Sequence, residues 1–189
     1  MSEKLTGILV KYQLIAFEEK EIYRFGIQQG IMLLLNFITV LAIGFAYDML
    51  FYVLVYIIAY IPLRSYAGGF HAQTHMRCYS YSVIILNTVL LIIKFLFIST
   101  SIYHIITLIS ILIIFLLSPV EDINKPLDKV EYITYRKKVR MILFFETVIY
   151  FITSYTKHSN AISLAFFTIS FFLIIGKIKL VVKCKEKNN

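Results

Sequence analysis

The chain has 189 residues, of which 59% are hydrophobic and 16% are charged. Soluble domains contain roughly 45–50% apolar residues, so the composition excludes a soluble globular protein, a disordered chain and a disulfide scaffold. The formal charge is +8. In so apolar a chain the cations indicate orientation in a bilayer, and we expect no nucleic-acid partner.

An amphipathic stretch opens the chain. Over residues 1–26, apolar side chains recur at helical spacing and charged side chains fall between them. This pattern predicts an amphipathic helix in the membrane interface. The alternative is a helix that presents a peptide substrate or a partner protein to the membrane. The stretch lacks the pattern of a secretory signal peptide, so none is expected.

The apolar segments that follow predict about six transmembrane helices, some of them short or re-entrant. One crossing needs about 20 apolar residues. Residues 31–63 are too many for one crossing and few for two. We interpret them as two short spans joined at Tyr47-Asp48, with a broken or re-entrant segment as the alternative. The other predicted spans are residues 79–99, 103–117, 141–152 with their flanks, and 161–176. The expected fold is an all-α integral membrane protein with a single polytopic domain over residues 1–189.

The cations predict the topology. If six spans cross and both termini are cytoplasmic, every Lys and Arg except Lys94 and Lys157 lies in a cytoplasmic segment. The positive-inside rule predicts this asymmetry. The cytoplasmic segments would then include a loop of residues 64–78, a basic loop of residues 118–140 and a basic tail of residues 177–189. We therefore expect a multi-pass protein of the cell membrane.

Five other residues carry charged, imidazole or thiol side chains. Lys94 and Glu146 fall within predicted spans, where charged groups are costly. They either pair with each other, or Lys94 extends toward the membrane surface. His104 and His158 fall in predicted outer loops and receive no role. Cys184 lies in the basic tail and is not expected to be catalytic or to form a disulfide.

The loop of residues 64–78 carries most of the chemistry in the chain. Gly68-Gly69 permits a tight turn, and His71, His75 and Cys78 follow at short spacing. Three interpretations stay open on these residues. The loop is a linker with an incidental cysteine, or His71, His75 and Cys78 bind zinc. In the third, Cys78 is a nucleophile and His71 its base, because a neighbouring imidazole or cation favours the reactive thiolate.

The pattern Arg64-(x)3-Gly68-Gly69-x-His71-Ala72-(x)5-Cys78, after two apolar spans, resembles the accessory gene regulator protein B family. Members are membrane-embedded cysteine peptidases of Gram-positive quorum sensing. The resemblance covers most of the chain. It implies that His71 and Cys78 are the catalytic pair and that Arg64, Gly68 and Gly69 support them. His75 is not part of the family pattern.

The same resemblance implies an activity and a substrate. The enzyme would cleave a short amphipathic propeptide with an acidic C-terminal tail through an acyl-enzyme thioester. It would then cyclise the peptide to a thiolactone or lactone autoinducing-peptide precursor, without a metal or another cofactor. Five cations of the basic loop either set topology and bind anionic lipid or dock the acidic tail: Lys125, Arg136, Lys137, Lys138 and Arg140.

Two further interpretations remain. A homodimer in the lipid bilayer is compatible with the sequence. A non-enzymatic small transporter or scaffold is the competing class, since several apolar spans and a basic loop fit it as well. The discriminating residue is Cys78, because a transporter should tolerate its replacement.

Overall fold

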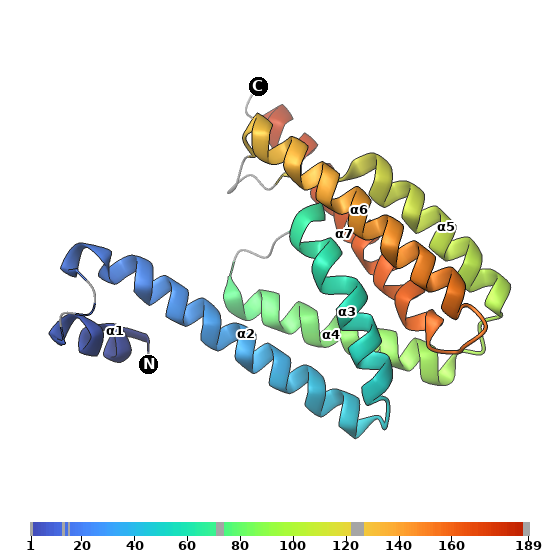
Figure 1. The fold of residues 1–189 in the computed structure, drawn as a ribbon, viewed down its shortest axis with the longest axis horizontal. Helices are drawn as coiled ribbons and strands as arrows, with labels where there is room; N and C mark the ends of the chain where they lie inside the picture. Colours follow the sequence, from blue (N-terminus) through green and yellow to red (C-terminus); the bar gives the residue numbers. More distant parts are fainter. Residues whose placement is uncertain (1, 13, 15, 71–73, 122–126, 187–189) are drawn as a thin grey trace.

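The chain folds into a set of long α-helices (Figure 1). The computed structural model describes residues 2–12, 14, 16–70, 74–121 and 127–186. Within those residues the elements are α1 (Ser2–Lys11), the 3-10 turn η1 (Phe17–Glu19), α2 (Lys20–Ala46), α3 (Leu50–Ala67), α4 (His75–Phe95), α5 (Thr100–Leu117), α6 (Lys129–Thr153) and α7 (Ser159–Glu186). The N-terminal stretch predicted as one amphipathic helix is divided between α1, η1 and the start of α2.

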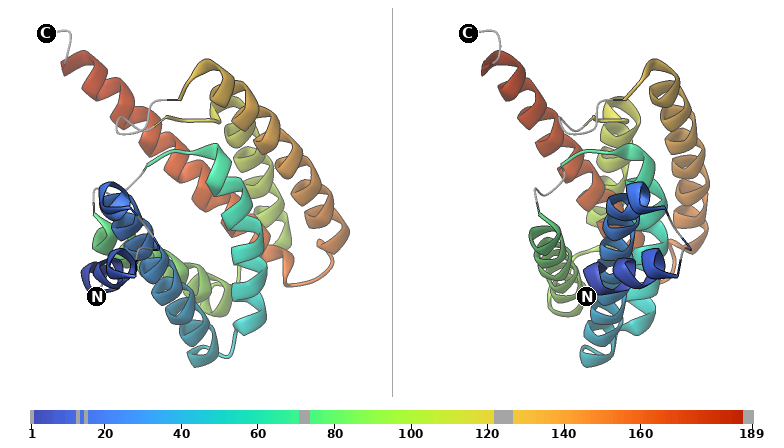
Figure 2. Two further views of the ribbon diagram at one scale, coloured as in Figure 1. Left: turned by 60° about the vertical axis from the view of Figure 1, so that its left-hand side comes forward. Right: turned by 90° about the vertical axis from the view of Figure 1, so that its left-hand side faces the viewer.

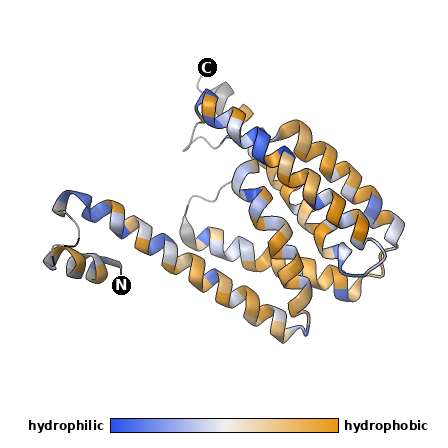
Figure 3. Cartoon of the chain, viewed as in Figure 1, coloured by the Kyte–Doolittle hydropathy of each residue, from blue (hydrophilic) through white to orange (hydrophobic). Residues whose placement is uncertain are grey.

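Five helices in the described part of the chain are long and apolar enough to cross a membrane, namely α2, α3, α4, α5 and α7. Figure 3 shows apolar residues along most of their length. The expectation of an all-helical, multi-pass membrane protein is confirmed. The predicted span at residues 141–152 forms the apolar C-terminal half of α6, whose N-terminal half carries the cations of the basic loop.

The apolar segment 31–63 forms a hairpin of two helices. The turn between α2 and α3 lies at Tyr47-Asp48, and Asp48 adopts a left-handed conformation with φ of 58°. Both helices have the length and composition of a span. However, α2 begins at Lys20 instead of residue 31, and its 27 residues measure roughly 40 Å. It is therefore longer than the ~30 Å hydrocarbon core.

The N-terminal part of the last helix, α7, lies at the centre of the helix group, and its C-terminal end projects from it (Figure 2). In its apolar window 61% of the residues are buried, against 11% in α2. It packs against α3 and α5, and small hydroxyl side chains allow close approach. Thr107 of α5 donates a hydrogen bond of 2.8 Å to Ser163 of α7, and such bonds help to hold helices together in lipid.

The helix ends gather at two opposite ends of the molecule. At one end, the segment after α3 pairs with the connection between α5 and α6 through a bridge of Gly68 with Val120. At the other end, Nζ of Lys94 donates a hydrogen bond of 2.9 Å to the carbonyl of Tyr47. The rings of His158 and Phe51 also meet there, with centroids 4.6 Å apart. The loop before α4 and the cationic start of α6 therefore share one end.

Two interpretations of isolated polar residues are wrong. Lys94 does not pair with Glu146, because its ammonium binds the Tyr47 carbonyl and lies over the Tyr47 ring. Oε2 of Glu146 is buried and has no hydrogen-bond partner among the described residues. His104 does not lie in a loop. It lies in α5, where Nδ1 is 2.9 Å from the hydroxyl of Tyr150.

Candidate active site

Cys78 lies at the beginning of α4, where the chain turns back into the helix group. Oγ1 of Thr74 caps the helix by accepting a hydrogen bond of 3.3 Å from the backbone N–H of Arg77. The N–H of Cys78 donates to the Thr74 carbonyl at 3.0 Å. The thiol of Cys78 is free, and the residue is exposed. A sulfur at this position lies near the positive end of the α4 dipole, which stabilises negative charge.

The segment that leads toward Cys78 is fastened to the connection between α5 and α6. Gly68 and Gly69 have φ of 71° and 99°, a region that side chains disfavour. The N–H of Gly69 donates to the Val120 carbonyl at 3.0 Å, and the N–H of Val120 donates to the Ala67 carbonyl at 2.9 Å. A Cβ on Gly68 would collide with the Val120 carbonyl. Both glycines are therefore required by this docking.

The same segment also docks on α7. The N–H of Phe70 donates to the Phe172 carbonyl at 3.1 Å. This approach is possible because α7 has a glycine at the contact. A Cβ on Gly176 would lie 2.7 Å from Cα of Gly69 and 2.7 Å from N of Phe70. Sequence reasoning missed Gly176 as a site residue, although a lone glycine inside an apolar helix is a signal of close packing.

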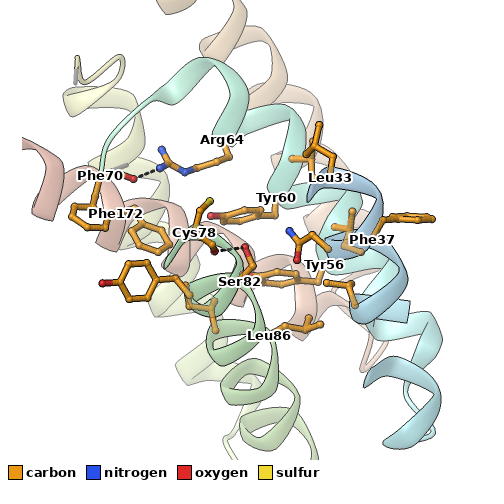
Figure 4. A pocket seen from close by; sticks show the side chains of 16 residues that line it. Leu33, Phe37, Tyr56, Tyr60, Arg64, Phe70, Cys78, Ser82, Leu86 and Phe172 are labelled. Atoms are coloured by element: carbon orange, nitrogen blue, oxygen red, sulfur yellow. Dashed lines mark hydrogen bonds between the residues drawn. The ribbon is translucent and has the colours of Figure 1, made fainter. Parts of the chain in front are cut away.

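Arg64 fastens the loop from the α3 side (Figure 4). Its Nη2 donates a hydrogen bond to the carbonyl of Phe70, and its guanidinium lies 5.4 Å from the ring centre of Phe172. Its Nη1 is buried and has no hydrogen-bond partner among the described residues. Tyr60, Arg64 and Cys78 line one cavity. Arg64 thus connects the turn at Gly68 and Gly69 (the glycine turn) with the cavity that Cys78 lines.

A cavity of about 510 Å³ opens beside Cys78 (Figure 4). Its walls come from α2, α3, α4, the segment after α3, and α7, and they are mostly apolar. Ser82, one turn below Cys78, donates a hydrogen bond of 3.1 Å to the Cys78 carbonyl and also lines the cavity. A second cavity of about 440 Å³ shares Phe70, Tyr81 and Phe172 with the first.

The structure describes part of the predicted catalytic loop. Arg64, Gly68, Gly69 and Cys78 are described and lie in one region. His71 lies outside the described residues, so its pairing with Cys78 stays a prediction. The same holds for the zinc interpretation that uses His71 and His75. Clusters of potential metal ligands are absent from the described residues.

The cations at the start of α6 lie near the ends of α3 and α5. Asp128 and Glu131 form a capping box that begins α6. Nζ of Lys138 lies 4.6 Å from the ring centre of Tyr66, and the guanidinium of Arg140 lies 4.5 Å from that of Phe115. The other members of the predicted docking set are Arg136 and Lys137, both exposed, and Lys125, which lies outside the described residues.

Comparison with known proteins gives one family. The model of accessory gene regulator B matches residues 2–176. Two similar relatives come from Clostridium perfringens. A putative AgrB-like protein 2 of strain 13 is 29% identical over 131 residues, and a putative AgrB-like protein of strain SM101 is 30% identical over 131 residues. Each match covers 66% of this chain and 59% of the relative. No solved structure matches the chain.

Proposed function

The chain belongs to the accessory gene regulator B family, and from this membership we propose that it is a membrane-embedded cysteine endopeptidase. Its substrate is a quorum-sensing propeptide, which it cleaves and cyclises. The observation that carries the proposal is Cys78, a free and exposed cysteine at a helix N-terminus beside a mostly apolar cavity.

The chemistry begins with attack by sulfur. Sγ of Cys78 forms a bond to the scissile carbonyl carbon while His71 accepts the thiol proton. The carbon–nitrogen bond then breaks, and His71 gives the proton to the departing amine. The product is a thioester between Cys78 and the N-terminal part of the peptide. A thiol or hydroxyl of that bound part attacks the thioester, the Cys78 thiolate leaves and regains a proton, and a thiolactone or lactone ring is closed.

Three features of the described chain support this role for Cys78. The start of α4 offers a positive dipole end to an anionic sulfur. The fastening of Gly68 and Gly69 to Val120 and α7 fixes one end of the loop that contains His71. The apolar walls beside Cys78 favour exclusion of water, which would otherwise hydrolyse the thioester before the ring closes.

We assign Arg64, Gly68 and Gly69 as positioning residues. Arg64 holds the Phe70 carbonyl, and the two glycines permit the turn that reaches Val120 and α7. None of these three residues needs to touch the substrate for this role. Their replacement should therefore lower kcat through displacement of the loop.

The test of the nucleophile compares the two cysteines of the chain. Purified protein is incubated with a propeptide whose ring-closing residue is replaced by Ala, so that the acyl-enzyme accumulates. We expect a hydroxylamine-sensitive adduct on Cys78 by mass spectrometry, no cleavage by Cys78→Ala, and normal cleavage by Cys184→Ala. Full processing by Cys78→Ala would falsify the mechanism.

The cations of α6 are proposed to dock the acidic tail of the propeptide. Neutralising the four of them should raise KM for an acidic-tailed peptide, and the effect should shrink at high salt because exposed charges are screened over about 8–10 Å. Lys157→Gln, four residues beyond the C-terminal end of α6, is the control and should leave KM unchanged. An unchanged KM in the fourfold variant would leave these cations without a role in docking. The four are Arg136, Lys137, Lys138 and Arg140.

A further inference from the structure

The cavity beside Cys78 has a defined chemical character. Phe37 of α2, Ile57 and Tyr60 of α3, and Ile85 and Leu86 of α4 give it apolar and aromatic walls. Its volume of about 510 Å³ lies within the roughly 300–1,000 Å³ of pockets that hold small ligands. Arg64 lines the cavity near Phe70. Away from Arg64, a charged group would lose its hydration on entry without compensation, so that part of the cavity selects apolar groups.

Three polar groups in the wall have no hydrogen-bond partner among the described residues: the hydroxyl of Tyr56, Nη1 of Arg64 and Oδ1 of Asn36. Of these, Oδ1 of Asn36 is a buried acceptor. A buried acceptor without a donor is costly. A backbone N–H of a bound peptide is a donor of the right kind. This requirement is not met by the hydrocarbon chain of a lipid.

The cations near the site lie around the rings of Phe70 and Phe172. Phe70 and Phe172 stack with ring centres 6.3 Å apart and form one wall of the cavity. Nζ of Lys179 lies 5.1 Å from the ring centre of Phe70, and Arg64 lies over Phe172. Arg64 thus lines the cavity beside these rings, whereas the wall away from them is mostly apolar, an arrangement that suits a substrate with an acidic part and an apolar part.

We propose that this cavity is the acyl-side specificity pocket, which binds bulky apolar side chains on the N-terminal side of the scissile bond. The inference rests on the proposed function, because it takes Cys78 as the residue that holds the acyl group. The acyl group remains bonded to Cys78, and Cys78 lines the cavity. Side chains next to the reacting carbonyl therefore lie at its opening, whereas the departing acidic tail lies toward the cations.

The test measures side-chain preference at Cys78 without the natural peptide. Full-length Cys184→Ser protein in phosphatidylcholine nanodiscs is treated with N-acetyl-phenylalanyl or N-acetyl-alanyl chloromethyl ketone. The sulfur displaces chloride, a carbon–sulfur bond forms, and the thiol proton passes to solvent or base. The reference thiol is that of Ser65→Cys in protein that also carries Cys78→Ala and Cys184→Ser. Ser65 is exposed near the end of α3, so its reaction rate corrects for the partition of each ketone into the bilayer.

The measured quantity is the ratio of the alkylation rates with the phenylalanyl and the alanyl ketone. We expect this ratio to be about 10- to 100-fold larger at Cys78 than at the reference thiol, because the burial of an aromatic side chain contributes a binding free energy of that size. Ser82→Phe fills the cavity below Cys78 and should reduce the preference to that of the reference. Phe37→Ala removes part of the wall and should reduce it as well. Phe45→Ala, an exposed phenylalanine of α2 outside the cavity, should leave it unchanged.

Two results would overturn the pocket. One is an equal preference for the phenylalanyl ketone at Cys78 and at the reference thiol. If mass spectrometry then finds a bound lipid that Ser82→Phe releases, the cavity holds lipid instead of the peptide side chain. The other is a preference that survives both Ser82→Phe and Phe37→Ala. Iodoacetamide, which has no side chain to place, separates this failure from that of the proposed function. If Cys78 reacts with iodoacetamide and the protein cleaves the propeptide, but neither ketone is preferred, then Cys78 is still the nucleophile and only the pocket is refuted.

Discussion

Replacing Gly176 by Ala sets two effects against each other. Alanine in a helix interior is favoured over glycine by about 1 kcal/mol, so α7 itself should become more stable. The new Cβ, however, would lie 2.7 Å from Cα of Gly69 and from N of Phe70. Non-bonded carbon atoms prefer about 3.5–4.0 Å. The loop before α4 must therefore move by about 1 Å.

That movement weakens two hydrogen bonds. One is the bond of 3.1 Å from the Phe70 N–H to the Phe172 carbonyl, and the other is the charged bond from Arg64 to the Phe70 carbonyl. Such bonds contribute about 1 kcal/mol and about 1.5–3 kcal/mol respectively. A displacement of 1 Å in a catalytic group costs roughly 10²-fold in rate. We therefore expect kcat for propeptide cleavage to fall by about 10- to 100-fold.

The assay compares Gly176→Ala with Gly30→Ala in reconstituted protein. Gly30 lies in α2, and a Cβ there meets nothing within 4 Å, so this control gains helix stability without displacing the loop. Thermal unfolding in detergent confirms that both variants are folded. Wild-type kcat in folded Gly176→Ala would refute the role assigned to the contact between α7 and the loop.

Three other predictions concern the cap of α4, the turn at Gly68 and the membrane topology. Thr74→Ala removes the cap of α4 and should destabilise its first turn by about 0.5–2 kcal/mol, with kcat reduced and Thr74→Ser restoring it; equal rates in both variants would contradict this. Gly68→Ala should lower kcat more than KM, because the collision with Val120 displaces the loop, and a change in KM alone would indicate a substrate contact. In a cysteine-free background, a membrane-impermeant thiol reagent added to intact cells should label Lys157→Cys and not Lys137→Cys, and the reverse pattern would overturn the predicted topology.

The sequence alone determined the class of fold and the turns between spans. Hydropathy and charge are local properties of the chain, and in lipid each span must satisfy its backbone hydrogen bonds within its own helix. This is why the apolar runs predicted all-helical spans and why Asp48 marked the hairpin. The polar cluster that ends in Cys78 was visible for the same reason, because it interrupts an apolar pattern. The start of α6 was placed too late, since a helix with a capping box at Asp128 continues through residues too polar for a span.

Only the tertiary structure decided what surrounds Cys78. The contacts of the glycine turn join it to Val120 and to Gly176, residues about 50 and 100 positions further along the chain, and no local pattern reports such a meeting. The partner of Lys94 was missed for the same reason, because the Tyr47 carbonyl belongs to a distant turn. The cavity is likewise built by four helices, each of which looks like an ordinary span. Its volume and its apolar walls exist only where those helices diverge.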